Sequence, residues 1–234
     1  MATDSFLITC EHGGNRLPAS YRSLFHGYDA LLETHRGYDL GALAMARALA
    51  RCLGAPLVSS TISRLLVDLN RSIGHPQLFS EVTRGALAAC RAKIIEKHYL
   101  PYRTRVEHLV RQSVSRGRRV VHISSHSFTP ELGGKLRCAD VGLLYDPSRR
   151  GEAKLCAKWK KLLAAGAPEF RVRRNYPYSG KGDGLTSHLR RVFPGRVYVG
   201  IELEVNQGIV RAAGRSWMML RTVLSDSLRT ACTA

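Results

Sequence analysis

The most informative stretch of the chain is residues 6–18, Phe6-Leu7-Ile8-Thr9-Cys10-Glu11-His12-Gly13-Gly14-Asn15-Arg16-Leu17-Pro18. Its first four residues form the apolar run expected of a short β-strand, and a polar turn with two glycines follows. Open α/β sheets carry reactive side chains in turns of this kind, at the carboxyl ends of their strands. The alternative is a tight loop in which the glycines serve only the backbone and His12 is an ordinary surface residue.

The size and charge of the chain limit its class. Its 234 residues are 44% hydrophobic, which is enough for a large core, and we expect a single domain over residues 1–234. The formal net charge is +18, with 36 Lys and Arg spread along the chain. Such a charge attracts anionic substrates or nucleic acid, but no zinc-knuckle, helix-turn-helix or aromatic RNA-binding motif accompanies it. We therefore expect a small anionic substrate and no nucleic-acid partner.

The cysteines and the N-terminus indicate the compartment. The six cysteines are scattered, without a Cys-x-x-Cys pair, so we expect reduced thiols and neither a disulfide framework nor a zinc finger. Residues 1–5 lack the basic and apolar regions of a signal peptide, and no apolar run reaches membrane-spanning length. The expected location is the cytoplasm, with no membrane partner.

Hydrophobic spacing predicts strands that alternate with helices. We expect strands at residues 6–9, 56–60, 64–71, 120–126, 139–145, 169–173 and 196–205. We expect helices at residues 37–53, 81–115, 149–165, 185–192 and 212–229, the second of them kinked or divided at Pro101. This order predicts an α/β fold, a three-layer sandwich with helices on both faces of a mostly parallel or mixed central sheet.

Polar side chains gather near the ends of four of the expected strands. They are Glu11, His12 and Asn15; Arg64, Asp68, Asn70 and Arg71; His126; and Glu202 with Glu204. The carboxyl ends of parallel strands share one edge of a sheet, where such folds bind ligands. Histidine with carboxylate or amide oxygen suits a hydrolytic zinc site, in which a bound water has a pKa near ~7, a glutamate takes its proton and an arginine neutralises the oxyanion.

Two pairs of residues require a choice. His122 and His126 are four strand positions apart, about 13 Å, so one ion does not bind both; we assign His126 to the metal and His122 to a structural role. Glu202 and Glu204 share one strand face. We predict Glu202 as the general base, while Glu204 binds metal or orients a ligand; the alternative for either is a structural ion pair with an arginine such as Arg64.

Five stretches of the sequence carry a resemblance to a known family. They are Cys10-Glu11-His12-Gly13-Gly14-Asn15, Asp39-Leu40-Gly41-Ala42, Ser63-Arg64-Leu65-Leu66-Val67-Asp68-Leu69-Asn70-Arg71-Ser72, His126-Ser127-Phe128 and Tyr178-Ser179-Gly180-Lys181-Gly182-Asp183-Gly184. In this order they resemble the N-formylglutamate amidohydrolases, which are related in fold to zinc carboxypeptidases and aspartoacylases. The resemblance implies a zinc-carboxypeptidase-like fold and covers most of the chain.

The resemblance implies a reaction and a set of residue roles. The reaction is hydrolysis of the amide of an N-formyl or N-acyl amino acid, such as N-formylglutamate, with one Zn2+ ion as cofactor. His12 and His126 match the metal ligands, Asn70-Arg71 the pair that binds the substrate carboxylate, Arg64 the arginine that polarises the carbonyl and Glu202 the base. The Gly-, Pro- and Tyr-rich loop at residues 175–184 is a candidate lid or substrate wall, with Tyr178 and Lys181 as substrate-binding residues.

One position departs from the pattern. The wider superfamily has a glutamate three residues after its first metal histidine, whereas this chain has Asn15. Either Asn15 coordinates weakly, or Glu11 or Asp39 supplies the carboxylate, or the metal site is degraded. A protein with a degraded site would be a noncatalytic binder of anionic carboxylate metabolites. The acyl group, the amino acid, the oligomeric state and the role of His188 stay open at this stage.

Overall fold

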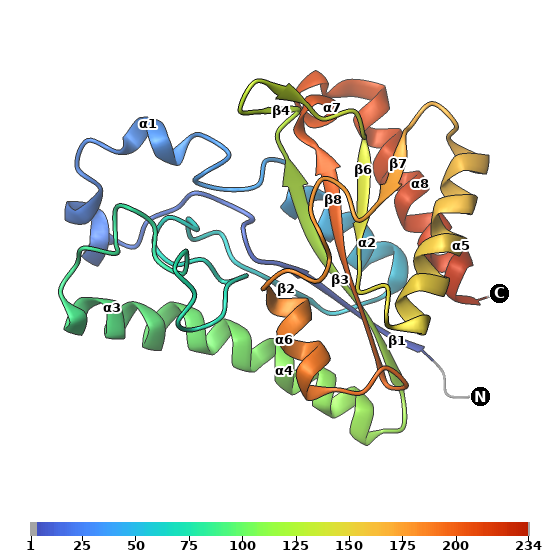
Figure 1. Ribbon diagram of the computed structural model, residues 1–234, viewed down its shortest axis with the longest axis horizontal. Coiled ribbons are helices and arrows are strands. Elements are labelled where there is room, and N and C mark those ends of the chain that lie inside the picture. Colours follow the sequence, from blue (N-terminus) through green and yellow to red (C-terminus); the bar gives the residue numbers. More distant parts are fainter. Residues whose placement is uncertain (1–3, 234) are drawn as a thin grey trace.

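The computed structural model describes residues 4–233 and is built on one central sheet of six strands (Figure 1). The strand order is β2-β1-β3-β8-β6-β7. The strands are β1 (Asp4–Cys10), β2 (Leu57–Ser59), β3 (Arg119–Phe128), β6 (Val141–Leu144), β7 (Val172–Arg174) and β8 (Tyr198–Asn206). All neighbours are parallel except β6 and β8, so the sheet is mixed and the predicted α/β fold is confirmed. Residues 1–3, part of the N-terminus considered above for a signal peptide, lie outside the described residues.

Three helices cover one face of the sheet, and Figure 1 shows two of them, α5 and α8, at its right. They are α2 (Ala42–Leu53), α5 (Arg150–Gly166) and α8 (Gly214–Thr233). Met45, Trp159 and Leu224 are fully buried against this face and anchor one helix each. The expected C-terminal helix is α8, which begins at Gly214 and runs to Thr233; a short helix that the sequence did not predict, α7 (Gln207–Ala212), precedes it and ends at Ala213, which has a positive φ.

The other face packs against a long helical rod and one short helix. The rod consists of α3 (Ala88–Ile94), the π-helical turn η2 (Ile95–Tyr99) and α4 (Leu100–Ser115); the short helix is α6 (Leu185–Val192). The expected helix therefore begins seven residues later than residue 81 and is interrupted at η2. Pro101 lies in the first turn of α4, directly after η2, and its missing N–H removes one hydrogen bond to the preceding turn of the rod.

Residues 64–71 are not the strand that the apolar run predicts. Their backbone forms turns instead, in which the Leu66 amide donates to Ser63 and the Arg71 amide donates to Asp68. The apolar side chains between them are all buried against the α4 face, whereas a half-exposed strand would bury only alternate residues. The prediction was wrong because the run fills the second core, where continuous burial favours no strand period. The turns also place Arg64 beside Asp68.

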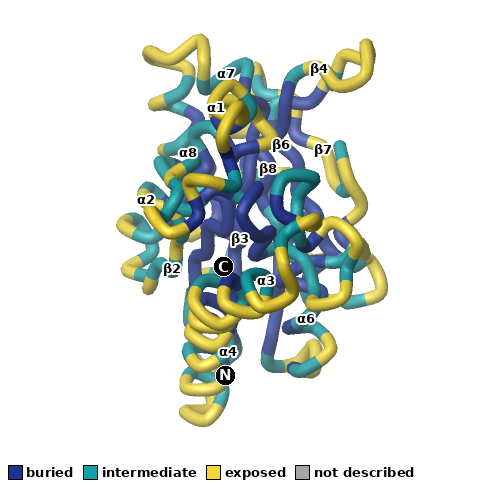
Figure 2. The backbone as a smooth tube through the Cα atoms, turned by 90° about the vertical axis from the view of Figure 1, so that its left-hand side faces the viewer, coloured by how far each residue is buried: buried dark blue, intermediate teal, exposed yellow. Residues whose placement is uncertain are grey.

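Short elements that the sequence pattern did not predict surround the carboxyl edge of the sheet. They are η1 (Ala19–Phe25), α1 (Asp29–Leu32) and a hairpin of β4 (Glu131–Leu132) and β5 (Lys135–Leu136). Figure 2 shows the hairpin exposed at one end of the molecule while the central strands are buried. Its turn uses Gly133 and Gly134, both with positive φ, which glycine tolerates at no steric cost.

All six cysteines are free thiols, as the sequence predicts. Two of them, Cys10 and Cys156, are fully buried in the core beneath α2, α5 and α8. Among residues 4–233, no helix combines the length and the hydrophobicity that crossing a membrane requires.

Candidate metal centre and active site

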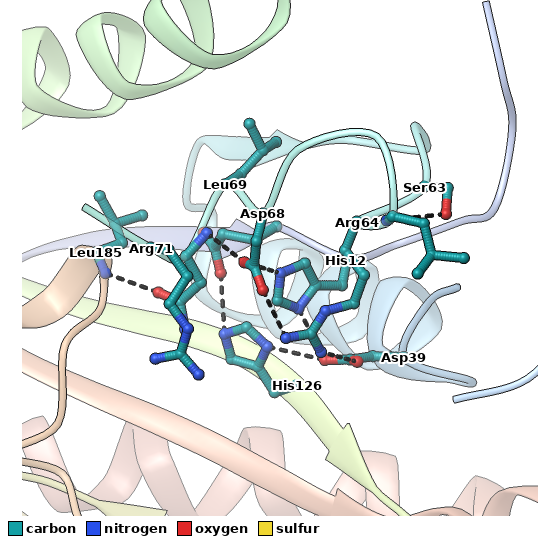
Figure 3. Close-up of polar contacts among 12 residues, drawn as sticks. His12, Asp39, Ser63, Arg64, Asp68, Leu69, Arg71, His126 and Leu185 are labelled. Carbon is teal, nitrogen blue, oxygen red and sulfur yellow. Dashed lines mark hydrogen bonds and ion pairs between the residues drawn. The ribbon is translucent and has the colours of Figure 1, made fainter. Parts of the chain in front are cut away.

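Two histidines and one aspartate converge at the carboxyl edge of the sheet (Figure 3). The Asp39 Oδ2 atom lies 3.3 Å from His12 Nδ1 and 2.9 Å from His126 Nδ1. The three side chains are buried, and each offers a ligand atom within 4.8 Å of the others. Two imidazoles and a carboxylate are a donor set that zinc prefers, and a water or substrate would complete its coordination. The arrangement is compatible with a metal ion.

The strand register explains why these residues meet. Strands β1 and β3 are parallel neighbours that pair Thr9 with Ser124, so His12 and His126 leave the sheet at the same edge. The Asp39 amide donates to the His12 carbonyl over 2.9 Å, which fixes the loop before α2 against the first turn. A side chain at Gly13 would meet the Ser60 carbonyl at 2.9 Å, so this close approach requires glycine.

The second ring nitrogen of each histidine contacts a further carboxylate. His12 Nε2 lies 2.7 Å from Asp68 Oδ1, and His126 Nε2 lies 3.0 Å from Glu11 Oε2. Glu11 also accepts a hydrogen bond from the Tyr102 hydroxyl over 2.8 Å. Each ring therefore presents Nδ1 to the centre and keeps Nε2 for an outer partner. Outer carboxylates of this kind fix the tautomer and orientation of metal-binding imidazoles.

The buried carboxylates and histidines shift one another's pKa values. Burial by itself raises the pKa of Asp39 and Glu11, but hydrogen bonds and charges of the histidines outweigh it and leave both pKa values well below the usual range. Burial lowers the pKa of His126, and its bonds to Asp39 and Glu11 raise it well above the usual value. A cation that binds His126 Nδ1 must therefore displace a proton, so its affinity should fall at low pH.

Arg64 lies between two of the carboxylates and faces a cavity of about 480 Å³. Its Nη1 and Nη2 atoms contact Asp39 Oδ1 at 3.3 Å and Asp68 Oδ2 at 2.7 Å. Although burial favours the neutral form, Asp68 and Asp39 raise the pKa of Arg64, so its charge is permanent. Both aspartates, Arg64, Ser127, Phe128, Thr129 and Tyr178 are among the residues that line the cavity. The predicted substrate-binding residue Tyr178 is thus in the same cavity as Arg64.

The two glutamates of β8 differ in their surroundings. Glu204 is the register partner of His126, and Glu202 is the partner of Ser124. The Oε1 atom of Glu202 accepts a hydrogen bond from the Thr186 hydroxyl of α6 over 2.6 Å. Glu204 is buried, and its Oε2 atom has no hydrogen-bond partner among residues 4–233. Burial, opposed by the charge of His126, raises the pKa of Glu204 to about 8.

The other two predicted metal ligands take different positions. Glu11 is behind His126 rather than at the centre. The Asn15 amide group donates to the Leu32 carbonyl over 3.3 Å and to Glu33 over 2.8 Å. Among the carboxylates considered from the sequence, Asp39 is the one that the structure brings to both histidines. In the sequence, only the Asp39-Leu40-Gly41-Ala42 motif pointed to this residue. No strand or helix pattern could place it beside His12, because it is 27 residues away in an irregular loop.

The predicted carboxylate-binding pair lies beside the start of α6. The Asn70 Oδ1 atom accepts from the Leu185 amide over 2.7 Å, and Arg71 Nη1 donates to the Asp183 carbonyl over 2.7 Å. The Arg71 Nε atom is buried without a hydrogen-bond partner among residues 4–233. Lys181 is exposed, 4.0 Å from Asp146, and is not among the residues that line the cavity.

The two remaining histidines in question are outside the His–Asp–His group. His188 Nε2 lies 3.2 Å from Glu107, on the α4 side of α6. His122 is buried in β3, with Nε2 at 2.9 Å from the Thr9 hydroxyl and Nδ1 at 2.7 Å from the Tyr198 hydroxyl. Both ring nitrogens of His122 are occupied, which favours the structural role.

His122 should make the protein less stable in mild acid. Burial lowers the pKa of His122 to about 4, so between that pH and the ordinary value of about 6.5 the unfolded chain binds more protons than the native protein. The free energy of unfolding should therefore decrease by about 2 kcal/mol between pH 7 and pH 5 because of this residue. Urea unfolding of the metal-free protein measures this decrease. In His122→Gln the decrease between pH 7 and pH 5 should be smaller by about 2 kcal/mol, whereas substitution of the exposed His108 by glutamine should leave it unchanged. An unchanged decrease in His122→Gln would contradict the assignment.

The fold and the site together define a class. It is an α/β protein in which neighbouring parallel strands place two histidines at one edge of the sheet, where an aspartate from a loop completes a buried group compatible with a metal. Comparison with sequence models of known families identifies the family: the family model for N-formylglutamate amidohydrolase matches residues 4–209. The chain belongs to this family. The resemblance inferred from the motifs is confirmed, and membership indicates an amidohydrolase with a small-molecule substrate.

Two solved structures share the fold. The gene product Atu2144 from Agrobacterium tumefaciens matches with a TM-score of 0.82 at 28% identity, over 98% of this chain and 91% of that one. An N-formylglutamate amidohydrolase from Ralstonia eutropha JMP134 matches with a TM-score of 0.71 at 19% identity, over 99% and 94%. A metallo-carboxypeptidase from Pseudomonas aeruginosa reaches a TM-score of only 0.44 at 14% identity, over 99% and 56%. No curated protein showed significant sequence similarity to the chain.

Proposed function

We propose that the protein is a cytoplasmic, zinc-dependent amidohydrolase that cleaves the amide of an N-formyl or N-acyl amino acid, such as N-formylglutamate. The observation that carries this proposal is the buried His12–Asp39–His126 group beside Glu204 of the neighbouring strand, whose Oε2 atom has no hydrogen-bond partner in the described part of the chain. Family membership supports the reaction type.

His12 Nδ1, Asp39 Oδ2 and His126 Nδ1 are the proposed ligands. Their spacing and chemistry fit a zinc ion, and the outer bonds to Asp68 and Glu11 hold both rings in the required orientation. A zinc ion bound there would polarise the substrate carbonyl, lower the pKa of a water molecule and favour the ionised form of Glu204.

Glu204 is the proposed general base in place of Glu202. Its Oε2 atom is free to take a proton from the attacking water and to pass it to the leaving amine nitrogen. Glu202, the base predicted from the sequence, is hydrogen-bonded to Thr186, which suits a role in orienting α6 and the residues around Asn70. Replacing each glutamate in turn with glutamine tests which of the two is the base.

The arginines supply the remaining roles. Arg64 faces the cavity with a permanent charge, so it can stabilise the oxyanion that forms when the carbonyl is attacked. Arg71 keeps a buried Nε–H group that no other described residue accepts from, and Asn70 lies next to it in the chain. A substrate carboxylate would satisfy that donor, and a guanidinium binds carboxylates with directional hydrogen bonds.

The test is metal analysis combined with an assay of formate release. We expect the purified protein to contain close to one zinc per chain and to release formate from N-formyl-L-glutamate. A chelator should abolish the activity, and added zinc should restore it. A protein that binds carboxylates but hydrolyses none of a panel of N-acyl amino acids, with or without zinc, would instead be a noncatalytic binder, and the proposal would be wrong.

A further inference from the structure

Arg137 packs against three residues that line the active-site cavity. It follows strand β5, and its guanidinium lies over the rings of Tyr178 and Phe128, at 5.0 and 5.8 Å from their centroids. Its Nη1 atom donates to the Tyr178 hydroxyl over 3.0 Å and lies 3.5 Å from the Thr129 hydroxyl. Tyr178, Phe128 and Thr129 all line the cavity that contains Arg64.

The backbone of Arg137 is fixed as well. Its amide donates to the Pro130 carbonyl over 2.8 Å, and its carbonyl accepts from the Asn206 side chain over 3.4 Å. Asn206 is the last residue of β8, so these bonds tie Arg137 to the rigid sheet. The guanidinium is therefore pre-organised, which lowers the entropy cost of binding a ligand there.

Arg137 has no carboxylate partner among residues 4–233, and its side chain contacts neutral hydroxyls and aromatic rings. Of the three arginines that line the cavity, Arg64 pairs with Asp39 and Asp68, Arg36 pairs with Glu81, and Arg84 is exposed. A half-buried cation without a counter-charge is unfavourable until an anion binds beside it. Its field reaches His35 on the cavity wall, where burial first and then Arg36, Arg64 and Arg137 lower the imidazole pKa.

We propose that Arg137 is a specificity-determining residue that binds an anionic group on the substrate side chain, distal to the amide that is cleaved. The inference rests on the proposed function. In this arrangement Arg71 takes the carboxylate next to the amide, and Arg137 takes the second anion at the outer wall of the cavity. Tyr178 positions the guanidinium through its hydroxyl and its ring.

Steady-state kinetics of the zinc-loaded enzyme on two substrates test the proposal. N-formyl-L-glutamate carries the distal carboxylate, and N-formyl-L-methionine has a side chain of similar length without charge. Arg137→Gln should raise KM for N-formyl-L-glutamate by about 10–100-fold, the effect expected of one charged hydrogen bond, with kcat nearly unchanged. Its kcat/KM for N-formyl-L-methionine should change by less than about threefold.

Matched variants separate this role from structure and from general charge. Arg84 lines the same cavity but is exposed, so Arg84→Gln removes an equal charge and should leave the ratio of the two substrates unchanged. Arg137→Lys should recover part of the loss, and Tyr178→Phe should reproduce a smaller part of it. Equal losses on both substrates in Arg137→Gln, or no loss on either, would overturn the proposal.

A binding measurement keeps the proposal testable even if the protein hydrolyses neither substrate. Calorimetry would compare glutarate, with two carboxylates, with pentanoate, which has the same number of carbons and one carboxylate. We expect the unsubstituted protein to bind glutarate more tightly than pentanoate. In Arg137→Gln the ratio of the two dissociation constants should fall by about tenfold or more. No preference for glutarate, or the same preference in Arg137→Gln, would overturn the role of Arg137. Absence of hydrolysis alone would overturn only the proposed function.

Discussion

Replacing Glu204 with glutamine should lower kcat for formate release from N-formyl-L-glutamate by about 10²–10⁴-fold, the range that a positioned general base contributes. The substitution keeps the size of the side chain but removes the proton acceptor beside His126. KM and bound zinc should change little, because Glu204 is not among the proposed metal ligands. The measurement is steady-state kinetics with metal analysis of each preparation.

Glu202→Gln is the matched control, because it makes the same change two residues earlier on the same face of β8. Its Thr186 partner can still hydrogen-bond to the glutamine oxygen, so we expect less than about a tenfold loss of kcat. A large loss in Glu202→Gln together with an active Glu204→Gln would return the role of base to Glu202.

Replacing Asp39 with asparagine should weaken zinc binding by about 100-fold or more, since it removes a charged ligand that contacts both histidines. Competition with a chromophoric chelator measures this affinity directly, without reference to activity. Because Asp39 also pairs with Arg64, circular dichroism of the metal-free variant should accompany the titration.

The control for Asp39 is Asn15→Ala. Asn15 donates its amide hydrogens to Leu32 and Glu33, so its removal should change zinc affinity by less than about threefold. Strong loss of zinc in Asn15→Ala, with normal binding in Asp39→Asn, would make Asn15 the third ligand.

The sequence predicts the fold well where composition, length and burial agree. The run at Phe6–Thr9 and the β-branched segment of β3 are short and apolar, which favours buried strands, and α2 has a clear helical period; the order of these elements implies a layered α/β sandwich. Residues 64–71 fail for a physical reason: a run buried on every side has no period that separates a strand from a series of turns.

The candidate site is predictable only in part. His12 and His126 follow from their places at the ends of neighbouring strands, which a strand pattern can indicate. Asp39 and Arg137 lie in a loop and beside a short hairpin, whose paths depend on tertiary contacts with His12, Pro130 and Tyr178. The choice between Glu202 and Glu204 likewise depends on the hydroxyl of Thr186, which belongs to a separate helix.

If His12, Asp39 and His126 bind one zinc ion, anomalous diffraction at the zinc edge from crystals of the zinc-loaded protein should locate that ion between them. We predict one strong peak at about 2.0–2.2 Å from His12 Nδ1, His126 Nδ1 and an oxygen of Asp39, with Glu204 beside it. No peak between these side chains in crystals grown with excess zinc, or a peak bound through other residues, would contradict the account.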